Sequence, residues 1–158
     1  MNLERYEYDF LPDRIEYEFY SVGPKGRIKK VVRFQPFTTG ASDMFNLAFG
    51  DWDEKAQTTN DIARSNNGDI NKVLATVSFI VLDFTEKFPN AKIFASGMAE
   101  RNRLYRMNIS RQLLPIYAFF HISGLTEDNV IEPFTKNKDY IAFIVKRRNL
   151  KRNFQPKS

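Results

Sequence analysis

Two loop-to-helix junctions carry residue types that could bind an anion. The first is the polar turn Ser-Asn-Asn-Gly-Asp at residues 65–69, which precedes an apolar run with Lys72 near its start. The second begins at Ser96 and continues into a stretch that contains four arginines. Backbone N–H groups at the start of a helix are unpaired and can point toward an anion. Arginines at positions i and i+3, such as Arg103 and Arg106, can hold one phosphate or carboxylate in bidentate fashion.

If the strands that precede both junctions run the same way, the junctions lie at one end of the sheet and line one polar pocket. The candidate residues for binding an anionic ligand are then Ser65, Asn66, Asn67, Lys72, Ser96, Arg101, Arg103, Tyr105 and Arg106. The alternative is that both junctions are ordinary helix caps. In that interpretation Asp69 complements the helix dipole, and the arginines pair with surface acids.

The composition excludes several kinds of site. The chain has 158 residues, no cysteine and one histidine, which rules out disulfides, thiolate metal sites, cysteine nucleophiles and multi-histidine zinc sites within one chain. His121 lies in the continuously apolar run 116–122, and we interpret it as a core histidine in a strand covered on both faces. The acids between Asp51 and Glu54 lack the spacing of a calcium-binding loop. We therefore predict no metal and no cofactor.

The positive charge is concentrated at the C-terminal end. The net charge is +5, but residues 146–158 hold six basic residues and no acid, which leaves 18 of the 24 basic residues against 19 acidic ones. A basic arm on a near-neutral body can hold a phosphate backbone or simply aid solubility. The residues that we assign to polyanion contact in this arm are Lys146, Arg147, Arg148, Lys151 and Arg152.

The hydrophobic patterns predict an α+β protein with a mainly antiparallel, twisted sheet of about five to eight strands. Its two principal helices are expected at residues 69–88 and 98–113. The first of these helices is apolar on nearly every side, so it must be covered on more than one face. Because no long linker interrupts the chain, we predict a single domain at residues 1–146, followed by the basic arm at 147–158.

A β-hairpin is predicted around the Gly-Pro-Lys-Gly turn at residues 23–26. Opposed residues then have numbers that sum to 49, so that Glu16 faces Arg33 and Phe19 faces Lys30. Cross-strand pairs of opposite charge, such as Glu16 with Arg33, partly neutralise the basic residues of the second strand, and the alternative is that these residues form a nucleic-acid-binding patch.

The chain shows no segment suited to a membrane. The N-terminal residues are acidic where a signal peptide is basic, and no apolar stretch of about 18 residues occurs. We expect a cytoplasmic protein that does not associate with membranes.

Four strings in the sequence resemble an uncharacterised family found in Bacteroidetes genomes. They are Phe49-Gly50-Asp51, the turn 65–69 together with 72–77, Arg103-Leu104-Tyr105-Arg106, and Glu132-Pro133-Phe134. The resemblance covers nearly the whole chain. That family has no assigned activity, so the resemblance implies no substrate and no catalytic residues.

Three functions of different classes agree with these features. The one that we favour is a non-enzymatic binding or regulatory protein that contacts nucleic acid or another polyanion through the basic arm and the arginine helix. The second is a small phosphoryl-transfer enzyme, such as a toxin-type nuclease, in which the arginines stabilise a phosphoryl transition state. The third is a homodimeric interaction module built on the apolar helix or an edge strand. A flat basic sheet face would favour the first, a cleft between the two junctions the second, and a large apolar patch the third.

Overall fold

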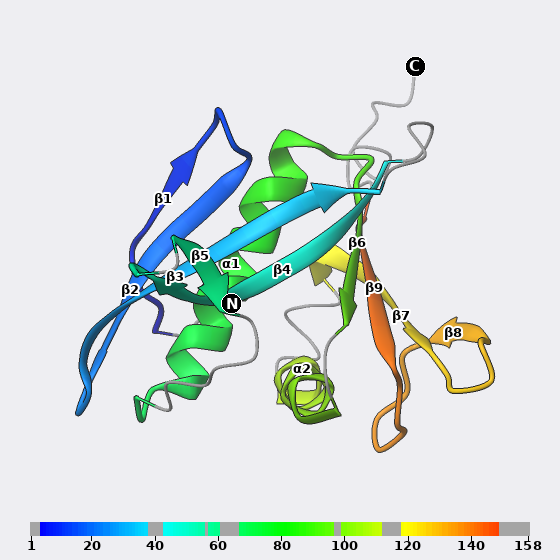
Figure 1. Ribbon diagram of the computed structural model, residues 1–158. Helices are drawn as coiled ribbons and strands as arrows, with labels where there is room; N and C mark the ends of the chain where they lie inside the picture. Colours follow the sequence, from blue (N-terminus) through cyan, green and yellow to red (C-terminus); the bar gives the residue numbers. More distant parts are fainter. Residues whose placement is uncertain are drawn as a thin grey trace. The chain divides into compact units, whose positions relative to one another are not determined.

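The fold was analysed in a computed structural model, shown in Figure 1, which describes residues 4–37, 43–55, 57–60, 67–96, 99–111 and 118–148. For residues 58–60, 99–101, 108 and 111 it describes the backbone only. The chain forms two compact units, Asn2–Val81 and Leu82–Ser158, and helix α1 spans their boundary. Each unit is described by itself below.

The first unit contains an antiparallel sheet with the strand order β1-β2-β3-β4, and β5 pairs with β4. The bounds of its strands are β1 Tyr8–Leu11, β2 Glu16–Gly23, β3 Gly26–Pro36, β4 Met44–Asp53 and β5 Thr58–Asn60. Strand β4 pairs with β3 as far as Asp51 and with β5 as far as Asp53. Asp51 and Asp53 are therefore part of a strand, and Glu54 lies in the turn that follows it.

The predicted hairpin is confirmed with its register. Glu16 lies opposite Arg33, and Phe19 opposite Lys30. The Glu16 carboxylate accepts a hydrogen bond from Arg33 Nε at 2.7 Å, and Glu18 pairs with Lys29 at 3.1 Å. The basic residues of β3 are thus neutralised largely by acids within the same sheet.

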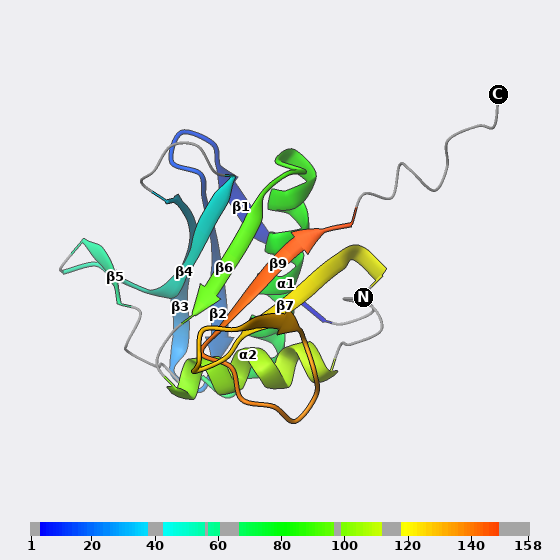
Figure 2. The same cartoon turned by 90° about the vertical axis from the view of Figure 1, so that its right-hand side faces the viewer.

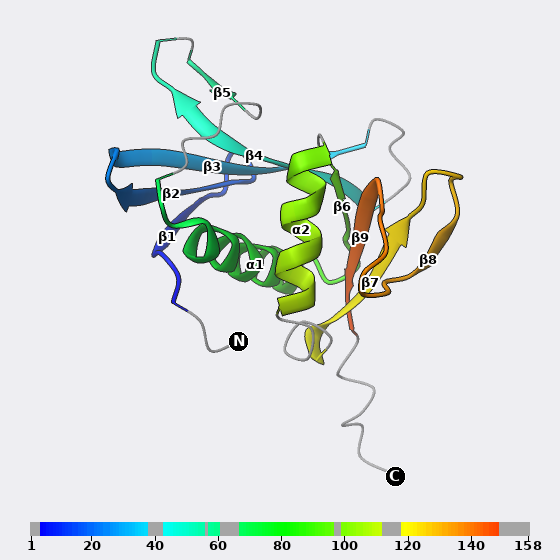
Figure 3. The ribbon, with the colours of Figure 1, turned by 90° about the horizontal axis from the view of Figure 1, so that it is seen from below.

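Helix α1 (Ile70–Lys87) is the long apolar helix that the sequence predicts. Five consecutive residues, 73–77, are buried, which requires cover on more than one face. On the first unit, the Tyr6 backbone N–H donates to Thr76 Oγ1 at 2.8 Å and so joins the segment before β1 to the helix. Figure 3 shows the first part of α1 beside β1, β2 and β3.

The second unit contains an antiparallel sheet with the strand order β6-β9-β7-β8. Its elements are β6 Lys92–Ser96, α2 Ala99–Arg111, β7 Phe120–Leu125, β8 Ile131–Pro133 and β9 Ala142–Arg147. Figure 2 shows β6, β9 and β7 side by side. The Tyr105 ring of α2 packs edge-on against the Phe143 ring of β9, with 6.3 Å between their centroids. This contact fixes α2 on one face of the sheet.

Two features of this unit differ from what the sequence predicts. His121 is exposed, so its interpretation as a core histidine is wrong, and β7 alternates between buried and exposed residues. The reason is that Phe120 and Ile122 project from the buried face of this sheet, whereas His121 projects from the opposite face. Residues 131–133, for which the sequence shows no strand pattern, form the short strand β8. The predicted end of the second helix, at residues 112–113, lies outside the described residues.

The predicted α+β class is confirmed, because the strand pairs of both units described above are antiparallel and two principal helices accompany them. No helix in the described part of the chain has both the length and the apolar character needed to cross a membrane.

Candidate functional site

The described part of the turn at residues 65–69 is attached to the β2–β3 hairpin through one buried amide. Asn67 is 2% exposed. Its Oδ1 accepts a hydrogen bond from the Lys25 backbone N–H at 2.7 Å, and its Nδ2 donates to the Gly26 carbonyl at 2.9 Å and to Ser21 Oγ at 3.2 Å. A Cβ at Gly23 would lie 2.0 Å from the Asn67 carbonyl oxygen, so this close approach of two backbones requires glycine.

Asp69 uses its carboxylate within the same unit. Its Oδ2 accepts hydrogen bonds from the Tyr6 hydroxyl at 2.6 Å and from Ser21 Oγ at 2.5 Å, while its carbonyl accepts the Val73 N–H at 2.9 Å. Burial raises the pKa of the Tyr6 hydroxyl, and its hydrogen bond to Asp69 raises that pKa further. The Lys72 ammonium lies 4.4 Å from the centre of the Tyr6 ring, in a cation–π contact.

Asn67 and Lys72, the two described candidates of the first junction, are therefore both engaged in contacts within the first unit. Ser65 and Asn66 lie outside the described residues. The convergence of the two junctions concerns residues of both units and stays a prediction.

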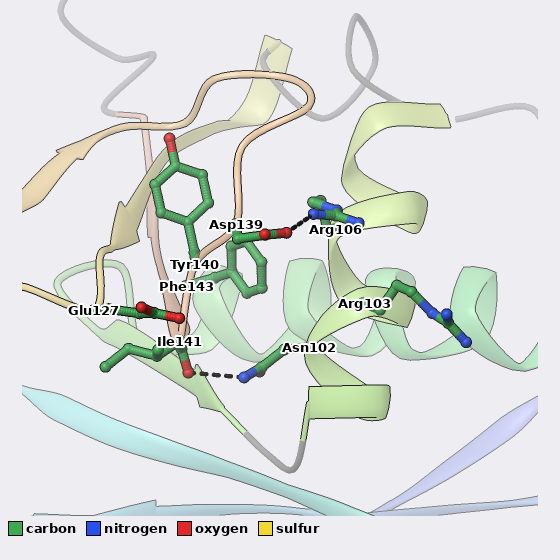
Figure 4. A pocket seen from close by; sticks show the side chains of 8 residues that line it. All are labelled: Asn102, Arg103, Arg106, Glu127, Asp139, Tyr140, Ile141 and Phe143. Carbon is green, nitrogen blue, oxygen red and sulfur yellow. Dashed lines mark hydrogen bonds and ion pairs between the residues drawn. The ribbon is translucent and has the colours of Figure 1, made fainter.

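The second junction belongs to the second unit, where α2 presents a polar face to the loop before β9. Arg106 forms an ion pair with Asp139, and Asn102 Nδ2 donates to the Ile141 carbonyl at 2.9 Å. Figure 4 shows both contacts. Tyr105 is only 8% exposed, because its ring packs against Phe143. Arg103 is exposed, and within the described residues it has no ion pair or hydrogen bond.

The other two candidates of this junction are less informative. Ser96 is the half-buried last residue of β6. Arg101 lies in α2, but its side chain is outside the described part of the structure.

A pocket of about 450 Å³ lies between α2 and the loops on either side of β8. This volume is within the usual range of small-molecule sites. The residues that line it are Asn102, Arg103, Arg106, Glu127, Asp139, Tyr140, Ile141 and Phe143. In Figure 4 the guanidinium group of Arg103 extends to the side of α2 that is opposite Asp139. The pocket thus combines an apolar base with Arg106, Glu127 and Asp139 at its rim, whereas the Arg103 guanidinium points away from Asp139.

The loop beside this pocket is held by a second polar network. Glu132 accepts hydrogen bonds from Lys138 Nζ at 2.8 Å and from the Tyr140 hydroxyl at 2.9 Å. The Lys138 and Tyr140 hydrogen bonds lower the pKa of Glu132, and Glu132 in turn raises the pKa of Lys138. The Tyr140 ring lies over Gly124, where a Cβ would come within 2.3 Å of a ring carbon. These contacts give the pocket a defined wall.

The first residues of the predicted basic arm belong to the sheet. Arg147 is the last residue of β9, and its guanidinium donates to the Leu82 carbonyl at 3.0 Å in the last part of α1. The Arg148 N–H donates to the Phe119 carbonyl at 2.8 Å. Lys151 and Arg152 lie outside the described residues. Of the described residues of the arm, Arg147 thus serves the packing of α1, whereas Lys146 points to the opposite face of the sheet.

Four side chains form a basic cluster, which we define as Lys92, His121, Lys146 and Arg148. Lys146 lies directly between Lys92 of β6 and His121 of β7 in the register of the sheet. Directly opposed residues of antiparallel strands project from the same face, and so do residues two apart in one strand. Arg148 Nη1 lies 3.5 Å from His121 Nε2, which places it beside this row.

In the described part of the chain, the basic cluster lies on the more exposed face of β6, β9 and β7, and the opposite face carries the buried Ile93, Ile122 and Phe143. The contacts of β9 with α1 and α2 involve Arg147 and Phe143, which project from the other face. The strands β6, β9 and β7 contain no acidic residue, so no carboxylate from these strands neutralises the cluster.

A second row lies next to the basic cluster on the same face. Ile144 of β9 lies between Phe94 of β6 and Ser123 of β7. All three side chains are partly exposed. The face therefore presents a row with an aromatic ring and an aliphatic side chain beside a row of cations.

Sequence reasoning identified Lys146 and Arg148 but missed two members of the cluster. Lys92 was assigned only to a strand, and His121 was assigned to the core. The signal that could have found them is the alternation within the strands: in β9 the even-numbered residues 144, 146 and 148 share one face. Their neighbours, however, come from strands whose pairing the sequence does not specify.

The antiparallel strands and two helices define an α+β protein with a basic sheet face and a separate pocket. Residues 2–148 match DUF6934, a family of unknown function. The chain belongs to this family, so the resemblance to a family without an assigned activity is confirmed. No curated protein and no solved structure matches the chain.

Proposed function

We propose that the protein binds a polyanion of the nucleic-acid class on the basic face of β6, β9 and β7. The observation that carries this proposal is the row Lys92–Lys146–His121 with Arg148 beside it, on a face whose strands contain no acid. The basic residues that follow β9 in the sequence, Lys151 and Arg152, would extend the same positive potential. A cytoplasmic location, in agreement with the cysteine-free composition, is part of this proposal.

The distribution of charge between the two units supports this choice of surface. The second unit holds fourteen basic and seven acidic residues, whereas the first holds ten basic and twelve acidic ones. In the first unit, Lys29 and Arg33 of β3 are both paired with acids of β2. An anionic partner would therefore be attracted to the second unit, where the cations of the cluster have no acidic neighbour in their strands.

The proposal is tested with a double variant of the cluster, Lys92→Gln/Lys146→Gln. Binding to a fluorescently labelled oligonucleotide would be followed by anisotropy over a range of salt concentrations. Because each lost phosphate contact lowers the salt slope for a single strand by about 0.7, we expect the slope to fall by about 1.4 and the affinity at low salt to fall about tenfold or more.

The matched control is Lys55→Gln/Lys136→Gln, which makes the same change of charge at two exposed lysines outside the cluster. This control should bind almost as the parent does. Equal losses in both double variants would show that net charge alone governs binding. Absence of binding by the parent at low salt would refute the proposed function.

A second candidate function is the binding of a small anion in the pocket beside α2. The specific observation is that Arg103 has no ion pair or hydrogen bond within the described residues, while Arg106 already has Asp139 as its partner. A ligand carboxylate or phosphate would then compete with Asp139 for Arg106. The arginines of this site are also those that the phosphoryl-transfer alternative uses, so the same variants test that alternative.

The variant Arg103→Ala/Arg106→Ala should keep its fold but lose any rise in melting temperature that phosphate or nucleotides give the parent. Asp139→Asn, which frees Arg106, should enlarge that rise. If no anion raises the melting temperature of the parent, the pocket has no role as an anion site.

A further inference from the structure

We infer that the polyanion is a single-stranded nucleic acid, with its phosphates on the basic cluster and its bases on the row formed by Phe94, Ile144 and Ser123. This inference rests on the proposed function and specifies its ligand. It comes from the order of the rows on one sheet face: cations first, then a ring and an aliphatic side chain.

The spacing of the two rows suits one nucleotide chain. Phe94 is two residues from Lys92 in β6, and Ile144 is two residues from Lys146 in β9. Residues two apart in a strand are separated by about 6.8 Å, and neighbouring strands by about 4.8 Å. A strand of nucleic acid that crosses β6, β9 and β7 would thus meet Lys92, Lys146 and the His121 imidazole in turn and have a side chain of the second row beside it.

The chemistry of the second row distinguishes single strands from duplexes. An aromatic ring binds a base by stacking on its face, and every base has such a face. In a duplex these faces are covered by neighbouring base pairs, so the Phe94 ring could not reach them. The Ser123 hydroxyl adds a donor and an acceptor that can meet a base edge.

The small number of basic side chains in the cluster also favours a single-stranded ligand. It holds four side chains within three adjacent strands, so it can neutralise only a few phosphates. Affinity that comes from the phosphates alone depends on the number of phosphates that the protein neutralises. A site with few cations therefore needs a contribution from the bases, which the second row can provide.

The experiment compares polyanions that differ in the access they give to bases. The full chain would be titrated with an oligothymidylate of about 12 nucleotides, an abasic strand of equal length, the corresponding duplex, and inorganic polyphosphate. We expect the oligothymidylate to bind about tenfold more tightly than the abasic strand and the duplex.

The variant Phe94→Leu keeps an apolar side chain but removes the ring. It should weaken binding of the oligothymidylate about tenfold and leave binding of polyphosphate unchanged. Phe94→Trp, which keeps an aromatic face, should restore binding of the oligothymidylate. The melting temperatures of both variants are measured alongside, so that a loss of fold is separated from a loss of stacking.

The outcomes separate the two proposals. If polyphosphate, duplex and oligothymidylate bind equally, or if Phe94→Leu binds the oligothymidylate as the parent does, the face binds a polyanion without contacting bases and the inference is overturned. If none of the four ligands binds at low salt, the proposed function itself has failed.

Discussion

Replacement of Asn67 tests whether the turn at residues 65–69 serves the fold. Asn67→Ala removes an acceptor from the Lys25 N–H and two donors, one to the Gly26 carbonyl and one to Ser21 Oγ. Three contacts to a side chain that is 2% exposed are lost together. The change is confined to the first unit, where the turn meets the β2–β3 hairpin.

The expected loss can be estimated from these contacts. A neutral hydrogen bond contributes about 1 kcal/mol net, and a buried group left without a partner costs about 1–3 kcal/mol. Lys25 and Gly26 are exposed residues, so water can replace the amide at part of the site. We therefore expect Asn67→Ala to lower the free energy of unfolding by about 2–3 kcal/mol. For a chain of this length that corresponds to a melting temperature lower by about 5–10 °C.

The assay is chemical and thermal unfolding in a buffer without phosphate, so that no ligand contributes. Asn67→Asp has the same size and keeps the acceptor, but it loses both donors and places a carboxylate beside the Gly26 carbonyl. It should therefore destabilise the protein at least as much as alanine does. Asn71→Ala, at an exposed amide in the first turn of α1, is the matched control and should stay within about 0.5 kcal/mol of the parent. Stability of both Asn67 variants within that margin would refute the structural role and return the turn to the list of ligand sites.

Three further predictions concern other contacts. Hydrogen bonds from Lys138 and Tyr140 lower the pKa of Glu132, so its contribution to stability is full above its ordinary pKa of 4.5 and is lost as the pH falls through the folded value. The free energy of unfolding should therefore fall less with decreasing pH in Glu132→Gln than in the parent. Burial and the hydrogen bond to Asp69 raise the pKa of Tyr6, so its contribution to stability is present below its ordinary pKa of 10.0 and is lost as the pH rises through the folded value. The free energy of unfolding should therefore fall less with increasing pH in Tyr6→Phe than in the parent. Gly124→Ala should lower the free energy of unfolding by about 1–3 kcal/mol, since its Cβ would overlap the Tyr140 ring, and an unchanged midpoint in denaturant would contradict this.

The parts of the fold that sequence could predict are those set by local interactions. The register of the β2–β3 hairpin follows from a turn at residues 23–26 and from the alternation of the strands beside it, and it is confirmed from Glu16 to Gly23. Helix α1 was found because eighteen residues without proline or glycine carry apolar side chains at helical spacing. Strand β8 was missed because three residues between loops give no periodic pattern.

The environment of His121 shows why burial was harder to predict. A continuously apolar run predicts a strand covered on both faces, but in β7 only the face of Phe120 and Ile122 is buried, and His121 on the other face is exposed. Which face a helix covers depends on elements far apart in the sequence. The same limitation hid the basic cluster, since Lys92 and Lys146 become neighbours only through the pairing of β6 with β9.

The position of the basic residues, more than their number, distinguishes the two sheets. Strand β3 has the denser run of cations in sequence, yet Lys29 and Lys30 meet Glu18 and Asp51 within their own sheet. Each such pair reduces the potential that a phosphate would experience, and it would have to be broken before the cation could serve a ligand. In β6, β9 and β7 the register instead brings Lys92, Lys146 and His121 together without an acid in any of the three strands. Mutual repulsion in such a row opposes folding and is relieved when an anion binds, which is why this sheet is where we expect a phosphate backbone.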